Sequence, residues 1–146
     1  MGLIKQVEIR NITSVKAGMT EFYSSESNHE TILVQVPLGT KEELFVHHSQ
    51  TDQILVIRGT FVLVFLQNRE YHYIPLSEYQ PAIITIPSGI PHTTLNFSDE
   101  SSFVLNAVLR HGKPNKKEFL PIKPPFPYDL KAAKAVLQQL ETKICA

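Results

Sequence analysis

Residues 87–96 read Pro87-Ser88-Gly89-Ile90-Pro91-His92-Thr93-Thr94-Leu95-Asn96, and they predict a rigid corner between two strands. Proline fixes φ and lacks an amide donor, while glycine reaches backbone angles that are closed to other residues. The β-branched run 82–86 leads into this corner as a strand, and a second strand leaves it. His92 is therefore expected at a fixed position at the start of a strand rather than on a loose loop.

The rest of the chain alternates between short apolar runs and turns rich in Gly, Pro, Asn and Asp. Such runs recur at roughly 8–12 residues, a spacing typical of an all-β sandwich or barrel. Gly59 is expected to bend the apolar run 53–66 into two strands. The expected strands lie at residues 7–12, 31–36, 42–48, 53–58, 60–66, 71–76, 82–86 and 102–110.

Two of these runs pose the question of which face is buried. The run 54–66 carries so little polarity that both faces are expected to be covered, one by the barrel interior and the other by a second sheet or a partner subunit. In 102–110, the apolar residues with odd numbers are expected inside the barrel. That choice leaves Asn106 and Arg110 in solvent, and the alternative places both in a pocket.

The last part of the chain has a different pattern. Residues 121–127 are extended and stiffened by prolines, and Asp129 is placed to cap a helix over 130–140. Leu130, Ala133, Leu137 and Leu140 fall on one face of this helix. We expect that face to dock on the barrel or on a partner.

Composition bounds the class of protein. Lys plus Arg is 14 and Asp plus Glu is 14, so the chain is formally neutral, which argues against a nucleic-acid or membrane-surface binder. No apolar run approaches the length of a membrane span. The first residues lack the apolar region of a secretory signal, and the one cysteine, Cys145, cannot form a disulfide framework. We therefore expect a cytoplasmic protein.

The pattern Pro87-x-Gly89-x-x-His92-x-x-x-Asn96 resembles the second sequence motif of the cupins, small β-barrels that often hold a divalent metal. All four fixed positions are present, although Pro81 stands where the family motif opens with glycine. The resemblance implies one all-β cupin domain over residues 1–146, with a jelly-roll barrel (a double-stranded β-helix) over about 20–112. A proline-rich segment and a short C-terminal α-helix would follow over about 113–146. It also implies a homodimer, which cupins commonly form.

The first cupin motif, G-x5-H-x-H-x3-4-E-x6-G, fits this chain between Gly39 and Gly59. Phe45 takes its first histidine position, His47 its second, and Asp52 its glutamate position. Only one of the three ligand types is retained, with aspartate as a shorter substitute for a second. The motif therefore implies a barrel more strongly than it implies a complete ligand set.

These residues predict a metal site with a reduced ligand set. His47, or His48 if the motif is read one residue later, would join Asp52 and His92 to give two imidazoles and a carboxylate. Such a set binds Zn, Fe, Mn or Ni and leaves positions open to polarise a substrate or a water. Because successive strand residues point to opposite faces, only one of the two neighbouring histidines can face the barrel without a bulge. The alternative is a site without metal, in which the histidines are solvated and Asp52 opens a turn.

Two further residues are predicted to bind the substrate. Gln53 is an additional oxygen donor within reach of the predicted metal site. Asn96 closes the second motif, and its other interpretation is a side chain that hydrogen-bonds the backbone freed by the prolines.

Three functions fit these observations. The first is a metal-dependent enzyme acting on a small organic molecule, as a dioxygenase, decarboxylase or isomerase. The second is a metal-free epimerase or ketoisomerase for a nucleotide-linked sugar, with a histidine as general base, although the arginines form no cluster for a diphosphate. The third is a small-molecule binding or sensing module without turnover, which the apolar Phe45 in a ligand position favours.

Overall fold

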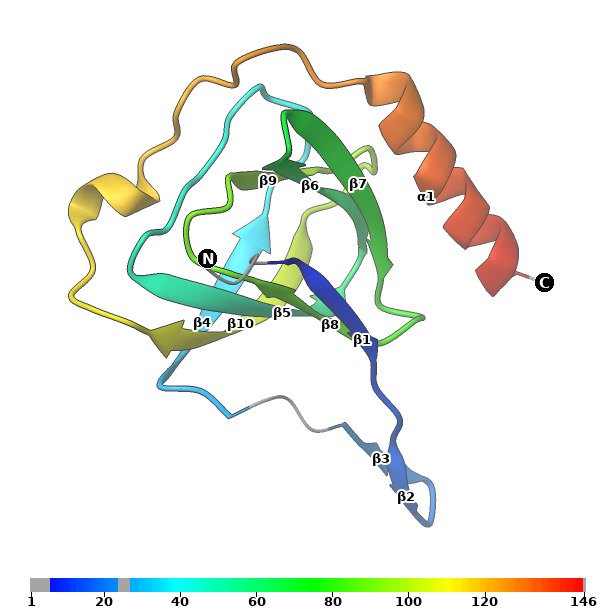
Figure 1. The fold of residues 1–146 in the computed structure, drawn as a ribbon. Helices are drawn as coiled ribbons and strands as arrows, with labels where there is room; N and C mark the ends of the chain where they lie inside the picture. The colour runs from blue at the N-terminus through cyan, green and yellow to red at the C-terminus, as the bar shows by residue number, and fades with distance from the viewer. Residues whose placement is uncertain (1–5, 24–26, 146) are drawn as a thin grey trace.

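The computed structural model describes residues 6–23 and 27–145, and they form an antiparallel β structure with one C-terminal helix (Figure 1). The strands are β1 (Glu8–Asn11), β2 (Val15–Ala17), β3 (Thr20–Phe22), β4 (Glu30–Val36), β5 (Gln50–Arg58), β6 (Thr60–Gln67), β7 (Glu70–Ser77), β8 (Ala82–Ile86), β9 (His92–Leu95) and β10 (Ser102–Arg110). The helices are a short 3-10 helix, η1 (Lys116–Phe119), and α1 (Leu130–Ile144). Across the described residues, no helix has both the length and the apolar character needed to cross a membrane.

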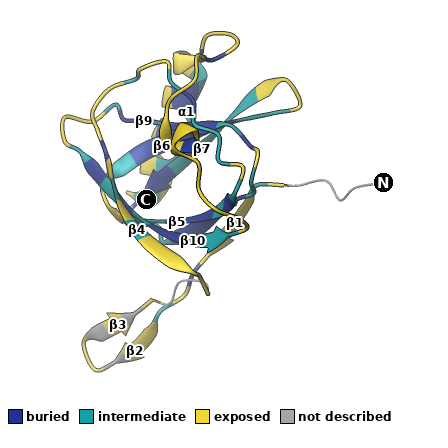
Figure 2. Ribbon diagram, turned by 90° about the vertical axis from the view of Figure 1, so that its left-hand side faces the viewer, coloured by how far each residue is buried: buried dark blue, intermediate teal, exposed yellow. Residues whose placement is uncertain are grey.

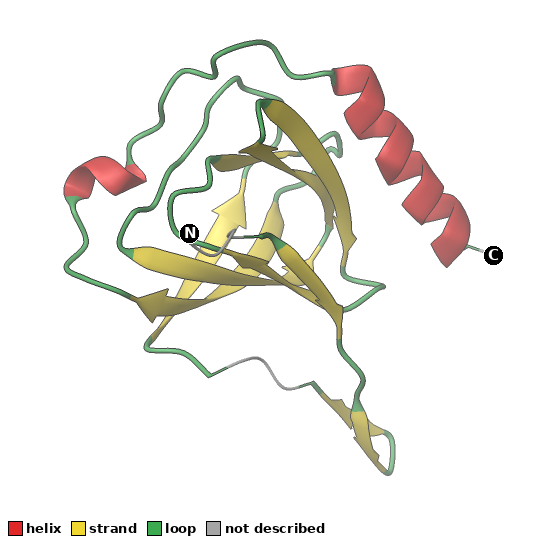
Figure 3. Ribbon diagram, viewed as in Figure 1, coloured by secondary structure: helices red, strands yellow, loops and turns green. Residues whose placement is uncertain are grey.

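Two sheets face one another and enclose the interior (Figure 3). The larger has the order β1-β8-β5-β10-β4 and the smaller the order β7-β6-β9. The hairpin β2–β3 stands away from both sheets and is largely exposed (Figure 2). The chain passes back and forth between the sheets, so each sheet contains strands from distant parts of the sequence. The all-β barrel predicted from the sequence is confirmed.

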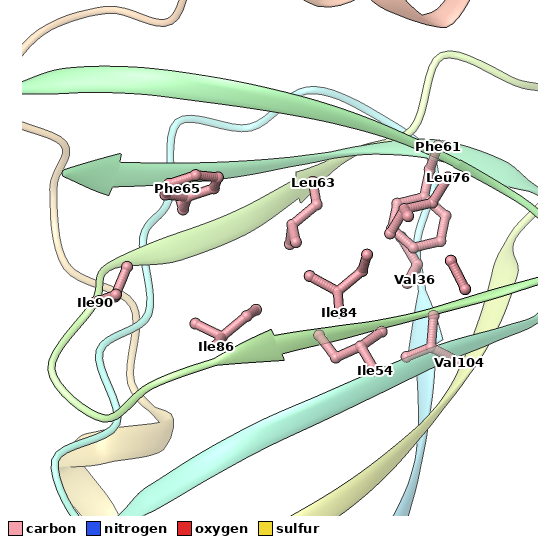
Figure 4. Packing of buried hydrophobic residues seen from close by; sticks show 11 residues of the cluster. Val36, Ile54, Phe61, Leu63, Phe65, Leu76, Ile84, Ile86, Ile90 and Val104 are labelled. Carbon is pink, nitrogen blue, oxygen red and sulfur yellow. The ribbon is translucent and has the colours of Figure 1, made fainter. Parts of the chain in front are cut away.

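The core lies between the sheets, where side chains of β6 point toward those of β5, β8 and β10 (Figure 4). Phe61 and Leu63 from the small sheet meet Ile54, Ile84 and Val104 from the large one. Each of these side chains is at most 8% exposed. Burying such a side chain contributes about 1.5–3 kcal/mol, so this contact holds the sheets together.

The outer face of β6 is covered by the chain's own C-terminal helix. Val62 and Val64 pack in one cluster with Ala133 and Leu137 of α1. The Asp129 side chain accepts a hydrogen bond from the Ala132 amide at 3.0 Å, which confirms it as the N-cap. Both faces of β6 are therefore covered, as predicted, and on the outer face the cover is α1 of the same chain rather than a partner subunit. The homodimer remains a prediction.

Several predicted elements agree closely with the structure, and one does not. The strands at 82–86 and 102–110 have the predicted limits, and Gly59 separates β5 from β6 with a φ of 100°. The strand predicted at 42–48 is wrong. Leu44 bridges Ile122 and Phe45 bridges His92, so successive residues pair with different segments and no continuous ladder forms.

The buried face of β10 was also assigned wrongly from sequence. Val104 and Val108 are buried, and Asn106, which has the same parity, is only 6% exposed and faces the interior. Phe103 and Leu105 lie on the outer face, half-buried. Counting apolar residues failed because the outer face of this strand is more apolar than the inner one, which carries Asn106.

Gly59 is a position where a side chain is expected to be poorly tolerated. A Cβ there would lie 2.1 Å from Ser102 Oγ and 2.8 Å from Ser102 Cβ, and Ser102 is fully buried. Gly59→Ala should lower the free energy of unfolding by about 3 kcal/mol, from overpacking added to left-handed backbone strain. Urea denaturation followed by circular dichroism measures this change.

Gly39→Ala is the matched control, because Gly39 also has a positive φ, 113°, but no atom lies within 4 Å of the point where a Cβ would be added. Gly39→Ala should lower the free energy of unfolding by about 1–2 kcal/mol, from backbone strain alone. Equal destabilisation by the two substitutions would contradict the close approach to Ser102.

Candidate functional site

A cavity of about 440 Å³ opens between the two sheets. Its walls are mostly apolar, with Val34, Ile54, Leu63 and Val104 among them. Its lining polar side chains include three that come together at one end, His47, Asp52 and His92, which we call the His-Asp-His cluster. One ligand atom from each lies within 4.8 Å of the other two.

His92 is fixed by the corner that precedes it. Gly89 has a φ of 85°, and its amide donates to the His47 carbonyl at 2.8 Å. His92 and Phe45 then exchange both backbone hydrogen bonds, at 3.0 and 2.9 Å. These bonds tie the corner to the segment that carries His47, so the backbone itself brings the two histidines together.

The tautomer of neutral His92 follows from its neighbours. Its Nδ1 lies 2.9 Å from the Ile90 carbonyl oxygen, which can only accept, so Nδ1 carries a proton. Its Nε2 lies 3.1 Å from Asp52 Oδ2. The same oxygen is 3.8 Å from Nε2 of His47. One carboxylate oxygen therefore faces two imidazole nitrogens in a buried position.

The charges of the cluster follow from its burial and contacts. Burial alone would raise the pKa of Asp52, but hydrogen bonding and charge from the protonated form of His92, with Asn106 and His47, lower it to about 2. Burial lowers the pKa of His47, against the opposing effect of Asp52. Near neutral pH the cluster thus presents a carboxylate and an unprotonated His47, the forms that bind a cation.

Asp52 is held in place by a chain of hydrogen bonds that sequence reasoning missed. Gln50, only 2% exposed, donates from Nε2 to Asp52 Oδ1 at 2.6 Å. Its Oε1 accepts from the Arg110 guanidinium, and Arg110 Nε donates to Glu30 at 2.8 Å. Because arginine only donates, the orientation of the Gln50 amide is fixed. No sequence motif contains Gln50, and its role depends on the pairing of β5 with β10.

The segment after β10 supplies the end wall of the cavity. Glu118 of η1 accepts hydrogen bonds from the amides of His48 and Ser49, at 2.7 and 2.8 Å, and from the Ser49 hydroxyl at 2.6 Å. The next residue, Phe119, lies against His47 with ring centroids 5.4 Å apart. Sequence analysis assigned no role to this segment because its partners lie some 70 residues earlier.

The sequence-predicted residues divide into two groups. His47, Asp52 and His92 meet, whereas His48 lies outside both the cluster and the cavity lining. Gln53 points to the other face of β5, where its Nε2 donates to the Ser27 and Ala107 carbonyls.

Asn96 likewise serves a turn. Its Oδ1 accepts from the Ser98 amide at 3.0 Å, and its Nδ2 donates to the Glu100 carbonyl at 2.9 Å. The structure therefore places neither Gln53 nor Asn96 on the cavity, where substrate binding was expected. Asn106, which was expected in solvent, lines the cavity instead.

Comparison with protein-family models gives no match, and comparison with curated protein sequences gives no significant one. Solved structures do match. A dTDP sugar isomerase from Desulfovibrio desulfuricans G20 superposes with a TM-score of 0.66 at 13% identity, covering 91% of this chain and 96% of that one. The WlaRB TDP-quinovose 3,4-ketoisomerase from Campylobacter jejuni gives 0.64 at 14%, covering 92% and 99%. A dTDP-4-dehydrorhamnose 3,5-epimerase from Elizabethkingia anophelis NUHP1 gives 0.63 at 15%, covering 86% and 79%.

These likenesses show the fold: the chain is a cupin-type β-barrel, as its second motif predicted. At such low identity they do not transfer an activity. The chemistry has to be argued from the side chains in the cavity.

The lowered pKa of Asp52 predicts a pH dependence of stability. A carboxyl group with an ordinary pKa of 3.8 when unfolded and about 2 when folded stabilises the fold fully above about pH 4 and loses that contribution as the pH falls toward 2. With a chelator present, the free energy of unfolding should fall between pH 6 and pH 2 by about 2 kcal/mol more in the native chain than in Asp52→Asn. Urea titrations at pH 2, 3, 4 and 6 measure the difference. Asp99→Asn, at an exposed carboxylate, is the control, and an identical pH slope in all three proteins would refute the prediction.

Proposed function

We propose that this cupin barrel is an enzyme that binds one divalent transition metal through His47, Asp52 and His92. It uses this centre for isomerisation or epimerisation of a small carbonyl compound. The fold, shared with sugar isomerases and epimerases, supports the reaction class. The His-Asp-His cluster supports the metal, because two imidazoles with one carboxylate form an open-faced ligand set.

One observation carries the proposal. With its proton on Nδ1, neutral His92 aims the lone pair of Nε2 at a carboxylate oxygen 3.1 Å away. Two acceptors at that distance repel unless a positive charge lies between them. Ligands about 2.1 Å from a common ion at 90–109° are separated by roughly 3.0–3.4 Å. The 3.1 Å from His92 Nε2 to Asp52 Oδ2 falls within this range, whereas the 3.8 Å from His47 Nε2 is longer, so His47 would have to move slightly closer to bind the same ion.

The surroundings of the cluster resemble those of known metal ligands. Metal-binding histidines usually donate their other ring nitrogen to a carbonyl, as His92 does to Ile90, and metal-binding carboxylates are themselves hydrogen-bonded, as Asp52 is by Gln50. Nδ1 of His47 is buried and has no hydrogen-bond partner among the described residues. Its ring is oriented by contacts with the His92 and Phe119 rings.

The residues of the cavity have separate tasks in this proposal. A metal bound here would polarise the carbonyl of a substrate and make an adjacent C–H more acidic. The apolar walls exclude water and hold the substrate body, while Asn106 lines the cavity and supports the Asp52 carboxylate. Gln50, itself oriented by Arg110, holds the Asp52 carboxylate in its orientation.

A second candidate uses the same residues without a metal. If a proton lies between His92 and Asp52, the pair is an imidazolium–carboxylate dyad, and His92 can act as a general acid and base. The same 3.1 Å contact favours this candidate, as do the sugar isomerases and epimerases among the structural neighbours. A binding module without turnover would show ligand binding but no product with either form of the site.

Metal content separates these candidates. Untagged protein from metal-replete growth should contain close to one equivalent of transition metal by mass spectrometry. Co²⁺ titrated into chelator-treated protein should produce visible absorption. His47→Ala should weaken Co²⁺ binding at least about 100-fold, because losing a ligand costs more than losing a residue that orients one.

His48→Ala is the matched control, since His48 is the adjacent histidine but lies outside the cluster. It should bind Co²⁺ as the native chain does. Less than a tenth of an equivalent in the native protein, with no Co²⁺ spectrum, would exclude the metal centre and favour the acid–base dyad.

Phe45 offers a gain-of-function test. It lines the cavity two residues before His47, on the same side of the chain, and its backbone pairs with His92. Phe45→His should add a third imidazole and tighten Co²⁺ binding by at least about tenfold. Phe45→Leu should leave affinity within about twofold of native. Unchanged Co²⁺ affinity in a folded Phe45→His protein would place the metal, if any, elsewhere.

A further inference from the structure

We infer that the cavity takes an amphiphilic small molecule with one oxygen-bearing head and a compact hydrocarbon body, and not a sugar linked to a nucleoside diphosphate. This inference rests on the proposed function only for the position of the head, at the His-Asp-His cluster. The preference for a hydrocarbon body follows from the walls alone. The substrate class is thus expected to differ from that named for the structural neighbours.

The walls are layered along the strands. Asp52 lies at the polar end, and the next inward residue of β5, Ile54, pairs with Asn106 of β10. One layer further, Val104 of β10 pairs with Val34 of β4, and both line the cavity. Leu63 and Phe61 of β6 face these layers from the other sheet. Away from the cluster, a ligand therefore meets chiefly hydrocarbon.

The charge of the lining does not suit a diphosphate. Among the described residues that line the cavity, Lys41 is the one lysine or arginine, and Glu43 lies two residues from it. Arg110 is outside the lining and is engaged by Glu30 and Gln50. Recognition of phosphate normally uses several cationic donors or arginine forks. The single lysine beside a glutamate supplies little net positive charge.

Sugar hydroxyl groups would also find few partners, chiefly Gln35, Thr93 and Thr94 outside the polar end of the cavity. The carboxylate of Asp52 is engaged by Gln50 and His92, and Asn106 Oδ1 already accepts from the Gln53 amide at 3.0 Å. A buried hydroxyl without a hydrogen bond weakens binding, whereas each buried methylene strengthens it by about a factor of four. The cavity favours carbon over hydroxyl at most positions.

Size points the same way. A cavity of about 440 Å³ lies toward the lower end of the range of about 300–1,000 Å³ that is typical of small-molecule sites. A branched or aromatic keto acid is a small ligand of this class.

Calorimetry with four probes tests the inference on Co²⁺-loaded and chelator-treated protein. The probes are pyruvate, which is the head alone, α-ketoisocaproate, phenylpyruvate and dTDP-glucose. α-Ketoisocaproate and phenylpyruvate should each bind at least about tenfold more tightly than pyruvate, and dTDP-glucose no more tightly than pyruvate. Tighter binding of dTDP-glucose, equal binding of all three keto acids, or no binding of either larger keto acid would overturn the inference.

Two neighbouring residues of β4 give a matched pair of variants. Val34 lines the cavity, whereas Leu33 is on the opposite face and 65% exposed. Val34→Thr keeps the shape of the side chain but adds a hydroxyl, and it should weaken α-ketoisocaproate binding at least about threefold while leaving pyruvate binding unchanged. Leu33→Thr should change neither. Equal effects of the two variants would contradict binding along this wall.

The two proposals fail in different ways. If Co²⁺ does not bind but the larger keto acids still bind more tightly than pyruvate in chelator-treated protein, the metal centre is wrong and the substrate class stands. If Co²⁺ binds with one equivalent and dTDP-glucose is the tightest probe, the metal centre stands and the substrate class is wrong.

Discussion

The site depends on one backbone crosslink. Phe45 and His92 pair through both of their amides, and Gly89 donates to His47, so the irregular segment before β5 is joined to the corner before β9. These bonds tie the segment that carries His47 to His92, the first residue of β9. These backbone hydrogen bonds fix the relative position of the two rings. The Nε2 atoms of both rings then face the Asp52 carboxylate.

Sequence reasoning succeeded where the information is local. The corner with its two prolines, the bend at Gly59 and the cap at Asp129 each follow from the backbone preferences of one or two residues. Motif spacing also predicted that His47 or His48 would join Asp52 and His92, and the structure brings His47 to the other two. The cupin barrel was therefore predictable from a motif whose ligand set is incomplete.

Where sequence reasoning failed, the missing information was long-range. The role of Gln50 exists only because Arg110 lies opposite it on the neighbouring strand, and η1 reaches Ser49 from far along the chain. Asn106 was misplaced because the outer face of β10 is more apolar than the inner one. Periodicity identifies the inner face of a strand only when the outer face is polar, and here it is not.

The η1 segment gives the cavity an unusual construction. Most of the wall is made of strands that also carry the fold's stability, but Phe119 comes from a segment held by the Glu118 carboxylate and by the pairing of Ile122 with Leu44. Changing that tail would reshape the end of the cavity beside His47 without disturbing the sheet packing. The end of the cavity beside His47 is thus shaped in part by a segment outside the two sheets, so descendants of this chain could vary that end while conserving the strands.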